Sequence, residues 1–292
     1  MASLRDIQHK INGVSKTKQI TKAMNMVASA KLRGAQAKIE RFRPYAEKYF
    51  EVLSDLSSGA GSSAHPLLEV HAAIKTVAII LITSDKGLCG SFNANLCAAA
   101  KKLALKKKAE GKDVKFICVG KKGRDFIRKT EFEILEHYVE AMNYFDFQLA
   151  SDIGSKVIRG YLDENLDEVY VLFGKFINIM RQEPELSAIL PVRYEKTETA
   201  QQVMSKEYIF EPSVEGLMAE ILPRYVNVLI YRGLLDTSAS EHAARMAAMD
   251  NATKNCDEMV RDLTLVYNKA RQTSITTQLI DIVGGAEALQ TA

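Results

Sequence analysis

Apolar residues recur along the first part of the chain at the spacing of a coiled coil. They fall alternately three and four residues apart, which places them on one face of a helix. This pattern predicts an amino-terminal helix over residues 1–57 that packs against a second helix along one seam. Pro44 is expected to kink this helix or to begin a new first turn in it. The seam positions are Leu4, Ile7, Ile11, Val14, Lys18, Thr21, Asn25, Ala28, Leu32, Ala35, Ile39, Phe42, Ala46, Tyr49, Leu53 and Leu56.

This seam is interrupted at one place. Polar residues occupy three consecutive seam positions, namely Lys18, Thr21 and Asn25. Within the same stretch the apolar residues move to a different face of the helix, at Ile20, Met24 and Val27. Such a change of phase locally unwinds a coiled coil. In a simpler interpretation, Lys18 and Asn25 only set the register of the two helices.

A second helix of the same kind is predicted over residues 209–292. Its seam ends at Ala270, after which the same spacing would bring polar residues into the contact. Fraying explains this change poorly, since apolar side chains would then lie exposed on an unpaired helix, and we expect other subunits to surround this end. The seam positions are Ala239, His242, Met246, Met249, Thr253, Cys256, Val260, Leu263, Tyr267 and Ala270, and the later apolar face is Ile275, Leu279, Ile282, Val283 and Ala286.

The middle of the chain has a different pattern, in which short apolar runs alternate with helical segments. Residues 58–75 begin with glycine and serine and predict a linker, and residues 196–208 are expected to connect back to the second helix. The alternation predicts that residues 76–195 form a Rossmann-like, doubly wound α/β domain with a parallel sheet. Strands are expected at 76–84, 113–120, 132–140 and 168–180, an edge strand at 183–194, and helices at 94–111, 123–130 and 147–164.

The fold class that follows is α+β or α/β: a long antiparallel coiled coil of the amino- and carboxyl-terminal helices with the doubly wound domain inserted between them. The two seams are the reason for the pairing. Each helix alone would leave its apolar face in water, and isolated helices are marginally stable unless such a face is buried.

Charge narrows the choice of partners. The formal net charge is only +3, which gives no general case for nucleic acid or an acidic membrane as partner. Between Met1 and Arg33, however, seven basic residues stand against one acidic residue. Because residues 1–41 contain no aromatic side chain for base stacking, a solvated helix face or an acidic protein partner explains this segment better than a nucleic-acid arm.

Neither a metal site nor a disulfide framework is expected. The four cysteines (Cys89, Cys97, Cys118 and Cys256) are far apart, with no C-x-x-C pair and no histidine at ligand spacing. The chain starts without an apolar signal core, and the apolar run at 76–83 is too short to span a bilayer. The sequence thus predicts a soluble, unexported protein of a reducing compartment, with no cofactor.

The loop "LITSDKGLCGSFNANL" at 81–96 is the one candidate for phosphate binding. It lacks G-x-x-x-x-G-K-[ST] and G-x-G-x-x-G, the patterns whose backbone amides wrap a phosphate. We expect instead a tight strand-to-helix turn with the helix capped by Ser91 or Asn93. Asp85 lies where doubly wound sheets bind ligands, but its position alone is weak support. An α/β nucleotide-binding enzyme with dimerising helices is the alternative function, and it would need a binding loop here.

Four stretches closely resemble the signature segments of the F-type ATP synthase gamma subunit family. They are "ITKAMNMVASAKLR" (20–33), "TSDKGLCGSFN" (83–93), "SEHAARMAAMDNATKN" (240–255) and "LVYNKARQTSITTQLIDIVGGA" (265–286). The resemblance implies the same antiparallel coil with an α/β domain at its side. It also implies a rotor of the central stalk, which turns inside a ring of alpha and beta subunits and couples ion flow through the membrane ring to ATP synthesis or hydrolysis.

The resemblance implies roles for particular positions. It implies no catalytic residue, since the beta subunits carry the chemistry. The contacts to the beta subunits would be Lys22, Met24, Val27, Lys86, Arg271, Gln272 and Thr276. The smooth apolar surface that turns within the ring, here called the bearing, would be Ile275, Leu279, Ile282, Val283 and Ala286. The foot, which meets the epsilon subunit and the membrane c-ring, would include Lys206, Glu207 and Tyr208.

The resemblance also implies partners and a place in the cell. The partners would be the alpha, beta and epsilon subunits and the c-ring, with membrane contact only through the complex. Chloroplast members carry an inserted cysteine pair that this chain lacks, so we expect no thiol switch. Because the chain starts without a mitochondrial transit peptide, a bacterial protein at the cytoplasmic face of the inner membrane is expected.

Overall fold

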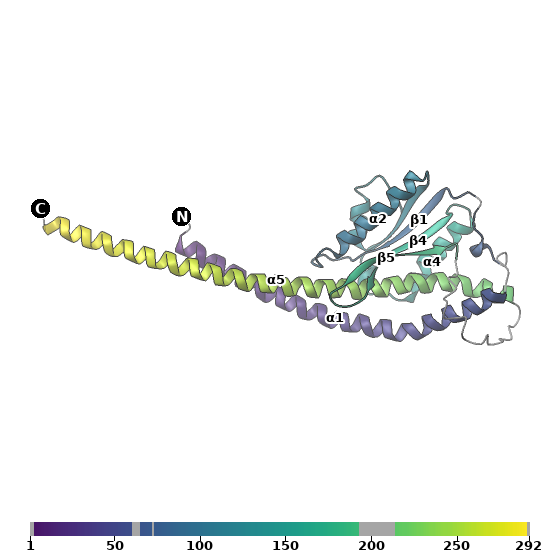
Figure 1. Ribbon diagram of the computed structural model, residues 1–292, viewed down its shortest axis with the longest axis horizontal. Helices are drawn as coiled ribbons and strands as arrows, with labels where there is room; N and C mark the ends of the chain where they lie inside the picture. Colours follow the sequence, from purple (N-terminus) through teal and green to yellow (C-terminus); the bar gives the residue numbers. More distant parts are fainter. Residues whose placement is uncertain (1–2, 60–64, 72, 193–213, 291–292) are drawn as a thin grey trace. The chain divides into compact units, whose positions relative to one another are not determined.

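The computed structural model describes residues 3–59, 65–71, 73–192 and 214–290 (Figure 1). The chain divides into two compact units, which are described separately. One consists of Met1–Ala28 with Met246–Ala292, and the other of Ser29–Arg245. Two long helices, α1 (Leu4–Gly59) and α5 (Val214–Gln290), contribute residues to both units.

In the first unit α1 and α5 run antiparallel and side by side (Figure 1). The hydroxyl oxygens of Thr21 and Thr253 lie 2.8 Å apart. Three residues earlier on α1, the Lys18 ammonium lies 2.5 Å from the carboxylate of Asp257, four residues later on α5. From one contact to the next, the residue number falls along α1 and rises along α5. The antiparallel coiled coil is therefore confirmed.

Burial in this unit follows the predicted seam. Ile7 and Ala28 on α1 and Met249 on α5 are buried. Further along α5, the seam positions from Thr253 to Ala270 are half-buried, while most of the residues between them are exposed. The three-and-four spacing therefore identified the contact face correctly.

The second unit is built on a five-stranded sheet with the order β3-β2-β1-β4-β5. The first four strands in this order are parallel, and β5 runs antiparallel at the edge. The strands are β1 (Thr76–Ile82), β2 (Asp113–Val119), β3 (Glu133–Tyr138), β4 (Glu168–Phe176) and β5 (Gln182–Leu190). The helices are α2 (Phe92–Ala109), α3 (Lys121–Ile127) and α4 (Phe147–Leu162), with short 3-10 turns η1 (Pro66–Leu68) and η2 (Ala141–Asn143).

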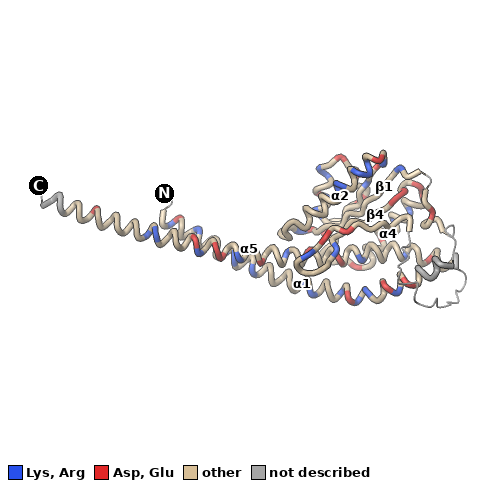
Figure 2. Tube along the Cα trace, viewed as in Figure 1, with Lys and Arg blue, Asp and Glu red and all other residues tan. Residues whose placement is uncertain are grey.

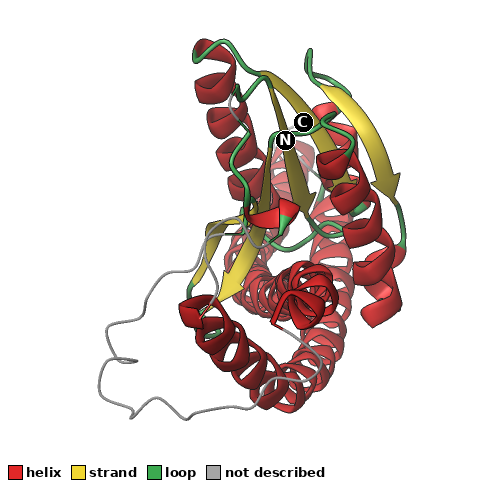
Figure 3. Ribbon diagram, turned by 90° about the vertical axis from the view of Figure 1, so that its right-hand side faces the viewer, coloured by secondary structure: helices red, strands yellow, loops and turns green. Residues whose placement is uncertain are grey.

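Helices cover both faces of this sheet (Figure 3). The central strand β1 is the apolar run "TVAIILI", and its side chains alternate between two cores. Ile80 and Ile82 face a core shared with α4 and α5, whereas Ile79 and Leu81 face a core shared with α2 and α3. The doubly wound domain and the edge strand are thus confirmed.

Several boundaries differ from the prediction by a few residues: β5 ends at Leu190 rather than at 194, and α3 covers Lys121–Ile127 rather than 123–130. The expected strand 168–180 ends at Phe176, and the chain turns there before β5 begins at Gln182. Pro44 lies inside α1 without starting a new first turn, because the helix is continuous from Leu4 to Gly59. The predicted connection at 196–208, including Lys206, Glu207 and Tyr208, lies outside the described residues.

The carboxyl ends of β1 and β4 form the switch point of the sheet, because the chain proceeds from β1 to β2 and β3 on one side and then to β4 on the other. Helix α5 packs directly onto this place. Thr237 accepts a hydrogen bond from the amide of Gly174 at 3.2 Å, and the Ser240 hydroxyl donates to the carbonyl of Gly174 at 2.9 Å. The crevice that holds a nucleotide in many such folds is therefore partly filled by the chain's own helix.

A tight turn between β2 and α3 depends on glycine. Gly120 has a φ of +96°, and a Cβ atom there would lie 2.2 Å from the carbonyl oxygen of Thr83. We predict that Gly120→Ala lowers the free energy of unfolding by about 2 kcal/mol or more, because the backbone of either segment must move. Urea unfolding followed by circular dichroism measures this. The control Gly34→Ala, in helix α1 with open space around it, should be neutral or stabilising.

One buried carboxylate makes the second unit sensitive to pH. Burial raises the pKa of Asp236, on α5, from 3.8 to about 6. The nearest cation is Arg232, whose Nε lies 3.9 Å from the carboxylate and offsets only part of the cost. The other charged groups that act on it are Arg43, Lys175 and Glu185.

Because the folded state holds this proton more tightly than the unfolded state, Asp236 costs stability above its folded pKa. Asp236 destabilises the folded state less as the pH falls from about 6 toward 4, because its carboxyl group becomes protonated. We predict that Asp236→Asn raises the free energy of unfolding at pH 7 by up to about 3 kcal/mol and has little effect at pH 4. Urea unfolding at pH 4 and at pH 7 measures the change in the free energy of unfolding. An equal gain in stability at the two pH values would contradict the raised pKa of Asp236.

Candidate functional site

The polar interruption of the seam is satisfied within the chain. Lys18 pairs with Asp257, Thr21 with Thr253, and the side-chain amide of Asn25 donates to the carbonyl of Met246 at 2.8 Å. A slip of one turn would separate all of these partners and leave polar groups against apolar ones. The structure therefore favours the simpler interpretation, in which the polar residues set the register of the coil.

A second apolar face of α1 points away from this seam. Ile20 is 59% exposed and Val27 58%, while Met24 between them is half-buried. Lys22 is exposed and borders a hollow of about 310 Å³ beside the coil. We call Ile20, Met24 and Val27 the α1 stripe. Its members have the spacing of one helix face, so a partner that contacts one of them reaches all three.

The end of α5 carries a larger exposed apolar surface. Figure 1 shows α5 continuing past the start of α1, and the bearing residues lie in this extension, which we call the tip (residues 271–286). Leu279 is 56% exposed, Ile282 67% and Val283 62%. Ile275 and Ala286 are exposed as well. Monomeric proteins seldom leave so many large apolar side chains along one element in water.

The tip is also nearly free of charge, as the tan colour of this part in Figure 2 shows. Arg271 and Asp281 are its only charged residues. Arg271, Gln272 and Thr276 are exposed, and the Thr276 hydroxyl donates only to the carbonyl of Gln272 in its own helix, at 2.9 Å. The tip thus combines an apolar surface with a few polar groups available to a partner.

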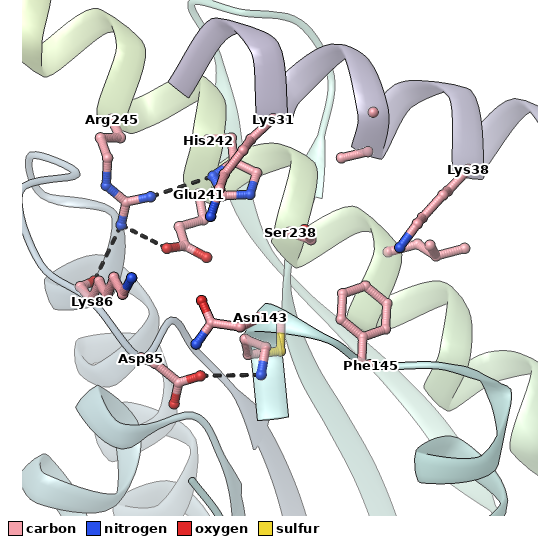
Figure 4. Close-up of a pocket in the computed structure, with 14 residues that line it drawn as sticks. Lys31, Lys38, Asp85, Lys86, Asn143, Phe145, Ser238, Glu241, His242 and Arg245 are labelled. Carbon is pink, nitrogen blue, oxygen red and sulfur yellow. Dashed lines mark hydrogen bonds and ion pairs between the residues drawn. The ribbon is translucent and has the colours of Figure 1, made fainter. Parts of the chain in front are cut away.

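Lys86 lies in the second unit, on the loop after β1 (Figure 4). The guanidinium of Arg245 donates to the backbone carbonyls of Lys86 at 3.4 Å and Gly87 at 3.1 Å, and to the carboxylate of Glu241 at 2.6 Å. The loop is therefore tied to α5 through its backbone, while the Lys86 side chain remains exposed.

Asp85, beside it, has a structural role. Its carboxylate accepts hydrogen bonds from the backbone amides of Lys121 at 2.9 Å, Glu140 at 2.9 Å and Met142 at 3.1 Å. These amides belong to the segments that follow β2 and β3. The carboxylate thus joins three loops at the carboxyl edge of the sheet.

The same loop differs from the prediction at the start of α2. Ser91 occupies the cap position, but its side chain makes no cap hydrogen bond. Asn93 instead bonds back to Ser84, accepting from its amide at 3.1 Å and donating to its hydroxyl at 2.7 Å. The prediction of a side-chain cap is therefore wrong. The polar side chains of Ser84 and Asn93 are used to close the turn.

Sequence reasoning missed the pair Glu241 and Arg245, although both are buried. The available signal was an acidic and a basic residue four positions apart in the small-residue stretch "SEHAARMAAM". His242, between them, is half-buried, and burial together with Arg245 and Lys31 lowers its pKa to about 4. It is therefore neutral at physiological pH, which fits its place in the predicted seam.

Two further observations bear on the class of protein. Within the described ranges, no cluster of three or more His, Cys, Asp or Glu side chains has the arrangement to hold a metal ion. None of the described helices combines the length and the hydropathy that a membrane span requires.

Comparison with known proteins places these surfaces in context. The ATP synthase family profile matches residues 3–289. The ATP synthase gamma chain of Maridesulfovibrio salexigens is 64% identical over 291 residues, which covers 99% of this chain and all of that protein. That of Nitratidesulfovibrio vulgaris strain Hildenborough is 64% identical over 290 residues, with the same coverage.

Solved structures resemble the fold. A chain in the mitochondrial ATP synthase central stalk and c-ring of Tetrahymena thermophila matches with a TM-score of 0.59 at 28% identity, over 80% of this chain and 99% of that one. A chain in the Euglena gracilis mitochondrial ATP synthase matches with a TM-score of 0.67 at 19% identity, over 99% and 95%.

The threonine pair of the seam permits a direct test of register. We predict that Thr21→Val and Thr253→Val each weaken the coil, and that the double variant loses less than the sum, with a coupling of about 0.5–1 kcal/mol. Hydrogen exchange of the amides in 246–260 measures the local opening free energy. Thr264→Val, whose hydroxyl bonds only within α5, is the control. Fully additive losses would mean that the two hydroxyls do not interact.

Proposed function

The chain belongs to the ATP synthase gamma-chain family, and on that premise we propose that it is the central-stalk rotor subunit of a proton-translocating F-type ATP synthase. In this role it turns inside a ring of alpha and beta subunits and couples ion flow through the membrane c-ring to ATP synthesis or hydrolysis. The match over 99% of the chain supports the role of a whole subunit rather than of one shared domain.

The observation that carries the proposal is the tip of α5. Each large apolar side chain there would gain about 1.5–3 kcal/mol on full burial, so the exposed surface favours a protein socket over water. A ring of alpha and beta subunits supplies such a socket. Since the tip has only two charged residues, rotation within the ring would break few strong polar contacts.

Torque requires that the two helices of the rotor do not slide along each other. The contacts of Lys18, Thr21 and Asn25 with α5 oppose such sliding, because each polar group would lose its partner. In this proposal the α1 stripe and Lys22 contact the moving acidic arm of a beta subunit. A second beta subunit is contacted by Arg271, Gln272 and Thr276. Lys86 is a further contact to the ring.

An asymmetric rotor can set three identical sites to three different states. Moving a two-state element from 1:99 to 99:1 takes about 5.5 kcal/mol of differential contact energy. Burial of two or three apolar side chains on one side of the coil is of this magnitude. The α1 stripe lies on one face only, so each beta subunit would meet a different surface as the coil turns.

The chemistry of ATP belongs to the beta subunits in this proposal, and the chain itself is not catalytic. It would lie at the cytoplasmic face of the bacterial cell membrane, attached peripherally through the complex. Lys206, Glu207 and Tyr208 would contact the epsilon subunit and the c-ring.

Reconstitution with alpha, beta and the membrane sector tests this function. We expect the chain to convert the alpha–beta ring into a proton-pumping, magnesium-dependent ATPase. Met24→Lys and Arg271→Ala should each lower the ratio of proton pumping to ATP hydrolysis by about threefold or more while the chain stays folded, because both alter contacts with the ring. Pumping is measured with a pH-sensitive dye in vesicles, and hydrolysis by phosphate release.

Matched variants in the second unit are the controls. Leu105→Lys introduces the same charge at an exposed apolar position on α2, and Arg128→Ala removes an exposed arginine after α3. Both should couple normally. Normal coupling in Met24→Lys and Arg271→Ala would reject the contact assignments, and a ring that pumps equally well without the chain would reject the rotor function itself.

A further inference from the structure

The second unit contains a cavity whose lining, apart from Lys86, has no part in the proposed rotor function. It has a volume of about 250 Å³ and lies between α1, α5 and the carboxyl edge of the sheet (Figure 4). Asp85 and Lys86, which follow β1, form one wall. It adjoins the switch point of the sheet, where doubly wound folds bind their ligands, and it remains open beside α5.

Three lysines converge on the cavity from two elements. Lys31 and Lys38 extend from α1, and Lys86 comes from the loop after β1 (Figure 4). None of the three forms an ion pair with another residue in the described part of the chain. The ammonium of Lys38 lies over the ring of Phe145, 5.5 Å from its centroid, which holds this group at the cavity.

Each of the two acidic residues at the cavity already has hydrogen-bond donors of its own. Glu241 is paired with Arg245 at 2.6 Å, with both side chains nearly buried. The Asp85 carboxylate accepts hydrogen bonds from three backbone amides. The cavity therefore keeps an excess of positive charge, because four basic residues, Lys31, Lys38, Lys86 and Arg245, outnumber the two acidic ones in its lining.

Neutral hydrogen-bond donors complete the lining. His242 receives a hydrogen bond from Arg245 at Nδ1, over 3.3 Å, so its proton is on Nε2. Burial, together with the positive field of Arg245 and Lys31, keeps this ring neutral by lowering its pKa to about 4. Ser238 and the side-chain amide of Asn143, which points into the cavity in Figure 4, add further donors.

We propose that this cavity binds a small phosphate-type oxyanion, held by Lys31, Lys38 and Lys86 with donors from the neutral lining. Three lysines and several N–H and O–H donors around one space, with a net positive charge, match the charge and the acceptor oxygens of such an anion. The volume lies below the range of about 300–1,000 Å³ that is usual for drug-sized ligands, so free inorganic phosphate fits better than a nucleotide.

Calorimetric titration of the full-length chain with inorganic phosphate tests the proposal. We expect saturable binding with a dissociation constant on the order of 1 mM at low salt. The double variant Lys31→Gln, Lys38→Gln should weaken it about tenfold or more. The matched control Lys101→Gln, Lys102→Gln, which removes two exposed lysines from α2, should bind phosphate normally.

A second measurement follows His242 by NMR, with His242→Gln used to assign its signal. Bound phosphate should raise the pKa of His242 from about 4 toward its ordinary value, because the anion offsets the field of Lys31 and Arg245. Three outcomes would overturn the proposal: no saturable binding of phosphate, an equal loss in both double variants, or tighter binding of adenosine monophosphate than of phosphate.

Discussion

The rest of the structure depends on the pairing of the two terminal helices along one seam. Each helix presents a narrow apolar stripe that is unstable in water, and the other helix is the surface that buries it. Apolar contacts alone permit sliding by whole turns, since one alanine or leucine replaces another at similar cost. The polar groups at Thr21, Asn25, Met246 and Thr253 remove this freedom, because a hydroxyl or amide without its partner loses a hydrogen bond.

The same helices also explain why a fold that is common among nucleotide-binding enzymes is used here without a nucleotide loop. α5 bonds to the end of β4 through Thr237 and Ser240, and it covers most of the switch point. The polar side chains of the loop after β1 form hydrogen bonds within the turn and to neighbouring segments. The sheet therefore acts as a support on which α1 and α5 pack, and the small cationic cavity remains open beside it.

In the proposed role, the chain acts through its surfaces. Where the two helices meet, the polar side chains have partners and the apolar ones are buried. At the tip and along the α1 stripe, apolar side chains remain exposed. This division is what a moving part requires: strong, specific contacts inside it and smooth contacts around it. An apolar surface such as Leu279 and Ile282 binds without fixed geometry, whereas buried ion pairs would hold one orientation.

The sequence by itself determined the elements and the fold class, because periods of two and of three to four residues are local signals that do not depend on distant partners. It also located the interruption at Lys18–Asn25 and the exposed tip, since both appear as a change of period.

Only the tertiary structure decided what these features mean. The partner of Thr21 lies 232 residues away, and nothing local selects Thr253 among the hydroxyls of α5. The binding of Asn93 to Ser84 instead of its own helix end, and the compensation of Asp85 by three amides, likewise arise where separate segments meet. Packing at the edge of the sheet sets such contacts, and the spacing of residues along the chain does not predict them.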